Sequence, residues 1–335
     1  MRSRCSPGHD RAVRAIQITE AGGPDVLTPT ELDDPVAGPG ELLVEVAAAG
    51  VNFIDTYQRE GVYPMALPYV PGMEGAGRVR SLGEGVEGFA VGDRVAWCEQ
   101  LGSYAELVAV EAAKAVPVPD GVDDDVAVGA LLQGMTAHFL VNDTYPVQPG
   151  DDVLVHAAAG GVGLLLTQLA TARGARVIAT VSTPEKAELA RGAGAADVID
   201  YTAEDDLAGA VRALTGGTGV AVAYDSVGRT TFDASLDSLR VRGMLVLFGA
   251  ASGPVPPVDP QRLNRGGSLY LTRPTLFHHV ATPEALRTRA AAVYHAVADG
   301  SLDVRIGHRY PLAEARSAHE DLHARRTTGK VLLQP

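Results

Sequence analysis

A glycine-rich turn between a strand pattern and a helix pattern constrains this chain more than any other feature of its sequence. A short apolar strand is predicted at Asp152–His156 and a helix at Val162–Arg173, with the turn Ala158–Gly163 between them. Such a turn brings free backbone N–H groups and the positive end of the helix dipole to one point. Because that point attracts phosphate, we predict that the turn binds the pyrophosphate of a nicotinamide dinucleotide.

Three small residues of the turn occupy the fixed positions of a G-x-G-x-x-G motif. Gly160 would let the backbone approach the pyrophosphate, and Gly163 would let the helix pack closely on the strand. Ala158 stands where the first glycine is usual, which implies a slightly different turn. The alternative interpretation is a tight turn between strand and helix that binds nothing.

The segment after the turn repeats the alternation of strand and helix. At this spacing the alternation indicates parallel βαβ units and therefore an α/β, doubly wound sheet. Strands are expected at Arg176–Val181, Asp197–Asp200, Val220–Asp225 and Met244–Phe248, with helices at Thr183–Arg191, Asp205–Leu214 and Thr231–Leu239 between them.

The two ends of the chain have a different pattern. Short strands separated by glycines in the first third are typical of a compact β-barrel. Those strands are expected at Val13–Thr19, Glu41–Ala49, Gly77–Ser81 and Arg94–Trp97. The tail is expected to form helices at Thr282–Ala298 and Leu312–Arg326 and a strand at Lys330–Gln334.

These patterns predict two domains, one of them discontinuous. The dinucleotide-binding domain is expected at 137–275, and the β-barrel domain at 13–136 plus 276–335. Residues 1–12 are expected to be a disordered extension or an artefact of start-site assignment, because the ordered pattern begins only after them.

Charge and composition exclude several classes of function. The 28 Lys and Arg residues against 41 Asp and Glu give a net charge of −13, with no basic stripe to offset it. Such a surface repels nucleic acid and anionic lipid, so a small-molecule substrate is expected. Two cysteines are too few for a disulfide framework, and no long apolar run or secretory signal is present. A cytoplasmic protein is therefore expected.

The strand after the glycine turn indicates which dinucleotide is used. NAD sites usually place a carboxylate at the end of this strand, where it binds the ribose hydroxyls. Here the strand ends in Ser182 and Thr183, with Lys186 one turn into the next helix. Hydroxyls and a cation suit a 2′-phosphate, so NADPH is predicted. The alternative is a Ser cap beside a solvated surface lysine.

Several motifs together resemble a known family. They include VNFIDTYQREGVYP (Val51–Pro64), PYVPGMEGAGRV, GDDVLVHAAAGGVGLLLTQLAT, YDSVGR (Tyr224–Arg229) and GSLYLTRPTL. Over about residues 13–335 the chain resembles the zinc-independent quinone oxidoreductases, the zeta-crystallin group of the medium-chain dehydrogenase/reductase superfamily. The resemblance implies a GroES-like β-barrel catalytic domain, a Rossmann domain, NADPH-dependent quinone reduction and a homodimer.

The resemblance also implies roles for individual residues around the cofactor. Arg273 and Arg325 would reach it from the far wall, and Ser226 would flank the adenine. The nicotinamide and its ribose would lie near Asn52, Phe53, Ile54, Asp55, Thr136 and Phe139, and the nicotinamide ring would lie over Phe248, Gly249, Ala250 and Ala251. The pyrophosphate would lie near Gly160, Gly161, Val162 and Gly163. The 2′-phosphate would lie near Ser182, Lys186 and Tyr201. The alternative interpretations are core aromatics, a helix cap at Asp55 and surface arginines.

No catalytic metal is predicted. Zinc-dependent relatives use a Cys and a Gly-His-Glu motif where this chain has Asn52 and Gly72-Met73-Glu74. Zinc prefers cysteine sulfur and histidine nitrogen as ligands, and this set has neither. The pair His278–His279 is expected to point opposite ways on a strand, and His156 is expected to be a satisfied core residue.

Without a Lewis acid, alcohol oxidation is not expected, whereas an electron-poor quinone needs mainly proximity and orientation. Tyr57 and Tyr63 could donate a hydrogen bond to a developing oxyanion or could simply form an apolar wall for a flat ring. The runner-up activity is reduction of the conjugated C=C bond of an enone or enoyl thioester. A non-catalytic NADPH-binding or RNA-binding accessory protein is the third hypothesis.

Overall fold

The computed structural model describes residues 12–335, which divide into two compact units. The first unit runs up to Val128 and includes Arg309–Arg325 and Val331–Pro335, and the second consists of Gly129–His308 and Arg326–Lys330. The second unit therefore extends beyond the 137–275 predicted for the cofactor domain. The predicted extension at 1–12 lies outside the described residues, except for Ala12, which begins the first strand.

The second unit is built on a six-stranded parallel sheet, as the alternation in the sequence predicted. Its strand order is β10-β9-β8-β11-β12-β13, so the order reverses beside β8. The strands are β8 (Asp152–Val155), β9 (Arg176–Val181), β10 (Asp197–Asp200), β11 (Val220–Asp225), β12 (Leu239–Leu247) and β13 (Tyr270–Thr272).

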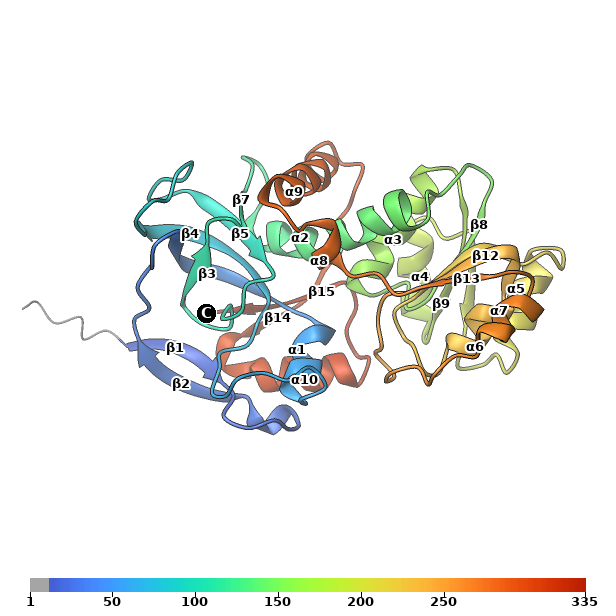
Figure 1. Ribbon diagram of the computed structural model, residues 1–335, viewed down its shortest axis with the longest axis horizontal. Helices are drawn as coiled ribbons and strands as arrows, with labels where there is room; N and C mark the ends of the chain where they lie inside the picture. The colour runs from blue at the N-terminus through green and yellow to red at the C-terminus, as the bar shows by residue number, and fades with distance from the viewer. Residues whose placement is uncertain (1–11) are drawn as a thin grey trace, which may run out of the picture. The chain divides into compact units, whose positions relative to one another are not determined.

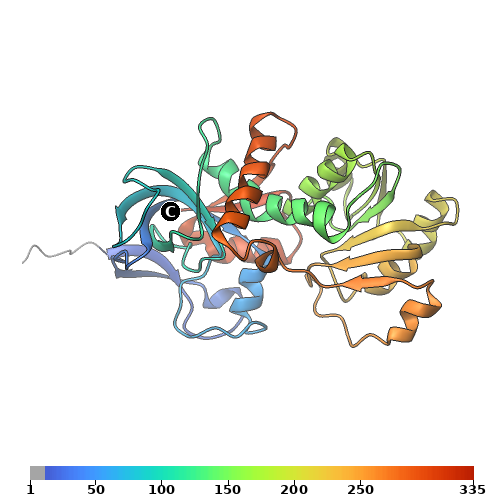
Figure 2. The ribbon, with the colours of Figure 1, turned by 45° about the horizontal axis from the view of Figure 1, so that its top comes forward.

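Helices cover both faces of this sheet, as Figures 1 and 2 show. The helix α3 packs beside α4, and α5 packs beside α6. Because β11 is covered on both sides, all six of its residues are buried. The helices are α3 (Gly161–Ala172), α4 (Pro184–Gly192), α5 (Leu207–Leu214), α6 (Phe232–Asp237) and α7 (Pro260–Arg265).

Three further helices connect to this unit. The helix α2 (Asp124–Phe139) continues as a single π-helical turn, η2 (Leu140–Thr144), and α9 (Pro283–Ala298) begins at the predicted Thr282 cap. The expectation of a strand at His278–His279 is wrong, because these residues end the short helix α8 (Leu276–His279). A run this short has no periodicity that separates strand from helix.

The first unit is mainly antiparallel sheet, with the β-rich start that the sequence predicted. One edge of the strand β3 pairs with β4. The other edge of β3 pairs with β6 along its first half and with β15 near its end, so these two strands share that edge. The strands of this sheet are β14 (Ile306–Pro311), β15 (Lys330–Gln334), β3 (Glu41–Val51), β4 (Glu74–Leu82), β5 (Arg94–Cys98), β7 (Ala115–Pro117) and β6 (Leu107–Glu111).

Short elements complete the first unit. The strands β1 (Ala12–Gln17) and β2 (Thr28–Asp33) form a hairpin with the 3₁₀ turn η1 (Pro24–Val26) between them. The helix α1 (Phe53–Arg59) follows β3 directly. The predicted helix at Leu312–Arg326 is a 3₁₀ turn, η3 (Leu312–Glu314), followed by α10 (Ala315–His323). Within residues 12–335, no helix combines the length and the apolar character needed to cross a bilayer.

Candidate functional site

The glycine turn has the geometry that close helix packing requires. A Cβ on Gly163 would lie 2.4 Å from the carbonyl oxygen of Ala157, so only glycine fits there. Ala157 itself adopts the left-handed backbone conformation, with φ of 50°, which turns the chain sharply after β8. Gly160 is the N-cap of α3, and the helix begins at Gly161. The first N–H groups of α3 therefore point out of the turn, where an anion can accept them.

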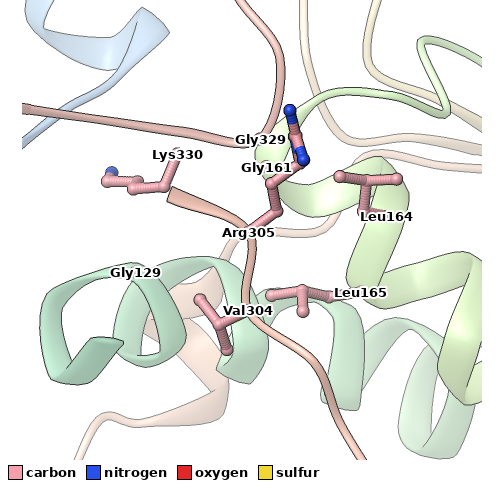
Figure 3. A pocket seen from close by; sticks show the side chains of 8 residues that line it. All are labelled: Gly129, Gly161, Leu164, Leu165, Val304, Arg305, Gly329 and Lys330. Carbon is pink, nitrogen blue, oxygen red and sulfur yellow. The ribbon is translucent and has the colours of Figure 1, made fainter. Parts of the chain in front are cut away.

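A second segment of the chain lies against this turn. The N–H of Gly329 donates to the carbonyl of Ala159 at 2.9 Å, and Gly329 forms a β-bridge with Gly160. Figure 3 shows the exposed Arg305 side chain extending toward Gly161 and Gly329, at the rim of a small hollow. The hollow is lined by Gly129, Gly161, Leu164, Leu165, Val304, Arg305, Gly329 and Lys330. No local sequence pattern connects Arg305 to the turn, so its position here was not predicted.

The residues predicted to surround the 2′-phosphate follow two neighbouring strands. Ser182 comes directly after β9 and Tyr201 directly after β10, and the N–H of Tyr201 donates to Val181. Lys186 lies in the first turn of α4, whose N-cap is Thr183: its hydroxyl accepts from the Lys186 N–H at 3.3 Å. Because β9 and β10 are adjacent and parallel, their carboxyl ends place these residues at one edge of the sheet.

Ser226, Phe248–Ala251 and Arg273, which follow β11, β12 and β13, lie at the same edge. Gly249 abuts Ser226 so closely that a Cβ on the glycine would lie 2.3 Å from the serine carbonyl oxygen. Phe248 and Ala250 follow β12, and Arg273 follows β13 and is exposed. The carboxyl edge of a parallel sheet, at the point where strand order reverses, is the usual ligand position in such folds.

A buried histidine between β8 and the glycine turn connects β9 with α6. His156 lies after β8, and its Nδ1 is 3.0 Å from the Thr180 hydroxyl of β9 while its Nε2 is 2.8 Å from the Ser235 hydroxyl. Ser235 donates to Asp225 at the end of β11. Burial lowers the pKa of His156, although Asp225 partly opposes this shift. His156 is thus a hydrogen-bonded core residue, as predicted.

Phe139 and Thr136 lie one turn apart on α2, but Phe139 is only 1% exposed. The imidazole of His279 stacks on its ring, with centroids 4.2 Å apart and planes 12° from parallel. His279 in turn pairs with Asp143 at 3.4 Å. Of the two stacked rings, His279 is therefore the more exposed, and it was not predicted as a site residue because its segment was expected to be a strand.

In the first unit, the predicted nicotinamide-ribose residues cluster at the start of α1. Asn52 is the N-cap, Phe53 and Ile54 form the first turn, and Asp55 is fully buried. The Asp55 carboxylate accepts from the Asn52 N–H at 2.8 Å and from the Tyr104 hydroxyl at 3.0 Å.

The predicted substrate residues form an aromatic group beside these. The ring of Tyr57 lies 6.4 Å from that of Phe53 and meets Tyr63 edge-on, with centroids 5.7 Å apart. Tyr63 is 43% exposed. Arg325, in the same unit, follows α10 in a left-handed conformation and is exposed.

The residues at the positions of zinc ligands do not fit a zinc ion. The Asn52 amide donates to Glu74 at 2.8 Å, and Gln58 lies 3.4 Å from the Met73 sulfur. This set offers an amide, a thioether and one carboxylate, whereas zinc prefers thiolate and imidazole. Across residues 12–335, no three His, Cys, Asp or Glu side chains are grouped to hold a metal ion.

Comparison with known proteins agrees with this architecture. The family model for an alcohol dehydrogenase GroES-like domain matches residues 38–120, and that for a zinc-binding dehydrogenase matches residues 161–287. A quinone oxidoreductase of Pseudomonas aeruginosa is 46% identical, covering 96% of this chain and 99% of that protein. A 2-haloacrylate reductase of a Burkholderia species is 42% identical with the same coverage.

Two solved structures are similar over nearly the whole chain. A mycobacterial protein complexed with NADPH is 55% identical, with a TM-score of 0.94, covering 96% of this chain and all of that one. The quinone oxidoreductase of Escherichia coli complexed with NADPH is 42% identical, with a TM-score of 0.93 and the same coverage. The chain therefore belongs to the quinone oxidoreductase family of the medium-chain dehydrogenase/reductase superfamily.

Proposed function

We propose that this chain is an NADPH-dependent quinone reductase that works without a metal ion. The observation that carries the proposal is the carboxyl edge of the second unit's sheet. There the glycine turn offers N–H groups to a pyrophosphate, while Ser182, Lys186 and Tyr201 gather at the ends of β9 and β10. Relatives solved with NADPH and named as quinone oxidoreductases support the same conclusion.

The residues present fit NADPH by their chemistry. The Lys186 ammonium and the Ser182 and Tyr201 hydroxyls are donors suited to a phosphate, and no carboxylate ends β9 to oppose it. We propose that Ser226 and Phe248–Ala251 hold the adenosine and nicotinamide sides, with Thr136, Phe139, Arg273 and Arg325 completing the site. Bound NADPH supplies the hydride.

In the first unit, Asn52–Asp55 and the aromatic group orient the two reactants. The edge-on pair of Tyr57 and Tyr63 leaves ring surface for a flat quinone to pack against. Either phenol can donate a hydrogen bond to the oxygen that gains negative charge when the ring accepts a hydride. One proton then completes the hydroquinone, so one NADPH and one proton are consumed for each quinone.

The direct test is NADPH consumption, followed by the absorbance of the reduced nicotinamide, over a panel of quinones. We expect turnover with NADPH and much less with NADH. Lys186→Ala should raise KM for NADPH roughly tenfold and leave KM for NADH nearly unchanged, because only NADPH carries the phosphate. Glu185→Ala, on the same helix turn, is the matched control. Equal losses with both cofactors would contradict the assignment of Lys186.

A second activity is favoured by one relative, the 2-haloacrylate reductase, which is as similar to this chain as several quinone oxidoreductases. Its name describes reduction of a conjugated C=C bond. Including 2-chloroacrylate, an enone and crotonyl thioester in the same panel separates the two activities. Faster turnover of these acceptors than of any quinone would favour the C=C reductase.

We further propose a cytoplasmic homodimer without nucleic-acid partners. The strand β13 pairs only with β12 in the described sheet, and Tyr270 on it is 51% exposed, so this edge is available to a second copy. Size-exclusion chromatography with light scattering tests the dimer.

The charge of −13 predicts no retention on an RNA or DNA affinity matrix.

A further inference from the structure

Four buried polar side chains in the first unit form one continuous row of hydrogen bonds. The row runs from Arg59 through His319 and Tyr104 to Asp55, and all four residues are completely buried. Arg59 Nη1 lies 3.0 Å from His319 Nδ1, His319 Nε2 lies 3.0 Å from the Tyr104 hydroxyl, and that hydroxyl lies 3.0 Å from Asp55 Oδ2. The members come from α1, from the segment after β5, and from α10.

The chemistry of the two ends fixes the direction of every bond in the row. A carboxylate only accepts, so the single hydroxyl proton of Tyr104 is donated to Asp55. The Tyr104 oxygen must then accept from His319, which places the imidazole proton on Nε2. A guanidinium only donates, so the bare Nδ1 accepts from Arg59. This pattern requires neutral His319. Burial, together with Arg59, lowers the pKa of His319 to about 3.

The guanidinium of Arg59, which begins the row, is also held by two contacts outside the row. Arg59 Nε donates to the Gly22 carbonyl at 3.1 Å, and Nη2 donates to Glu60 at 2.5 Å. The guanidinium is therefore fixed in position by two contacts before it reaches His319. Since a buried cation and a buried anion stand at opposite ends, each intervening bond is polarised in the same direction, which strengthens all of them.

At its other end the row reaches the proposed cofactor site. The oxygen of Asp55 that accepts from Tyr104 also accepts from the Asn52 N–H at 2.8 Å. Asn52 uses its amide to donate to Glu74 at 2.8 Å. The position of Asn52 at the start of α1 is thus determined on one side by Glu74 and on the other by Asp55, which the row holds in place.

We propose that Tyr104, His319 and Arg59 are positioning residues that act through Asp55 to set Asn52 for NADPH binding, an inference that rests on the proposed function. None of the three is predicted from the sequence, and none belongs to the proposed cofactor contacts. Tyr104 lies at the centre of this arrangement, because it alone joins the neutral imidazole to the carboxylate.

Tyr104→Phe is the decisive variant, because it removes one hydroxyl and keeps the ring volume. We expect the dissociation constant for NADPH, measured by fluorescence quenching on the full chain, to rise about tenfold, since the lost bond is to a charged group. In steady-state quinone reduction KM for NADPH should rise similarly while kcat at saturation changes less than about threefold. A purely structural role would instead lower the active fraction, and hence kcat, with KM unchanged.

Two further variants separate positioning from general damage. His319→Gln retains one donor and one acceptor and should bind NADPH within about threefold of wild type, whereas His319→Leu should behave like Tyr104→Phe. Tyr69→Phe is the matched control: it removes a buried hydroxyl from the same core, and no hydrogen-bond partner for that hydroxyl is found among the described residues. It should leave NADPH affinity unchanged.

The outcomes distinguish this inference from the function on which it rests. If the wild-type chain does not bind NADPH, the proposed function fails and the inference with it. If the wild type binds but Tyr104→Phe binds equally well, the inference alone is overturned. It is also overturned if Tyr69→Phe weakens binding as much as Tyr104→Phe does. Should His319→Leu not fold, the Tyr104→Phe result decides.

Discussion

Each unit buries one histidine in a row of hydrogen bonds that ends on a carboxylate, and the two rows differ at their other ends. In the second unit the row runs from Thr180 through His156, which directly precedes the glycine turn, and Ser235 to Asp225. In the first unit it begins at the Arg59 guanidinium and passes through His319 and Tyr104 to Asp55. One row starts at a neutral hydroxyl and the other at a buried cation.

This difference determines how each row responds to a change. A hydroxyl can rotate and exchange the roles of donor and acceptor, whereas a guanidinium can only donate. Asp225 also accepts hydrogen bonds from the N–H groups of Val227 and Gly228, so two donors outside the row stabilise its negative charge. The Ser235 hydroxyl can therefore turn its proton from Asp225 to His156 Nε2, and Nδ1–H then donates to Thr180. The second unit's row thus has two allowed arrangements, whereas the first unit's row has one.

The largest effect should come from breaking the first row at its charged end. Arg59→Met removes the cation and leaves the buried Asp55 carboxylate without it, so we expect a loss of about 3–5 kcal/mol in the free energy of unfolding. Thr180→Val, the matched change at the neutral end of the other row, should cost only about 1 kcal/mol. Urea unfolding measures both. Similar losses for the two variants would remove the distinction between the rows.

A smaller effect should follow from breaking the second row at its centre. Ser235→Ala leaves His156 Nε2 without its hydrogen-bond partner, and we expect a loss of about 2 kcal/mol in stability. NADPH affinity should change less than about threefold, because Val227 and Gly228 still hold Asp225. Titration of the variant with NADPH checks this. A tenfold loss of affinity would show that this row, like the first, positions cofactor residues.

The two rows also show what could be predicted from the sequence. The parallel sheet and the glycine turn were predictable, because strand and helix periodicities and the Gly163 contact depend on neighbouring residues. His156 lies within that segment, and its satisfied core role was predicted. In contrast, Arg59 and His319 are separated by 260 residues, and Tyr104 and His319 by 215. No local pattern relates such residues.

A partial signal for the first row was nevertheless present. Asp55 and Arg59 stand four residues apart on α1, the spacing of an ion pair on one helix face. In a sequence that spacing indicates an exposed pair, and only tertiary packing under α10 buries both residues. Packing likewise determines the position of Phe139, because its ring stacks on the imidazole of His279. His279 lies on α8, a segment that was expected to be a strand.

The smallest predicted effect concerns pH and separates the two histidines by titration. The folded pKa of His319 is about 3 against an ordinary value of 6.5, because burial and Arg59 oppose its protonation. At pH values above the ordinary pKa of 6.5, His319 is neutral in both the folded and the unfolded chain, so its titration does not change the stability. As the pH falls below it, the unfolded chain takes up a proton that the folded chain does not, and stability falls.

His319→Gln removes this titration, so its stability should decline less than that of wild type as the medium is acidified. Between about pH 7 and about pH 5.5 the difference should reach roughly 1 kcal/mol. The exposed His323, which pairs with Glu60, is present in both proteins and largely cancels in the comparison. Urea unfolding at a series of pH values measures the two slopes. Parallel slopes would mean that His319 takes up a proton in the folded protein, and then the Arg59–His319 bond could not have the direction assigned to it, because both partners would be donors.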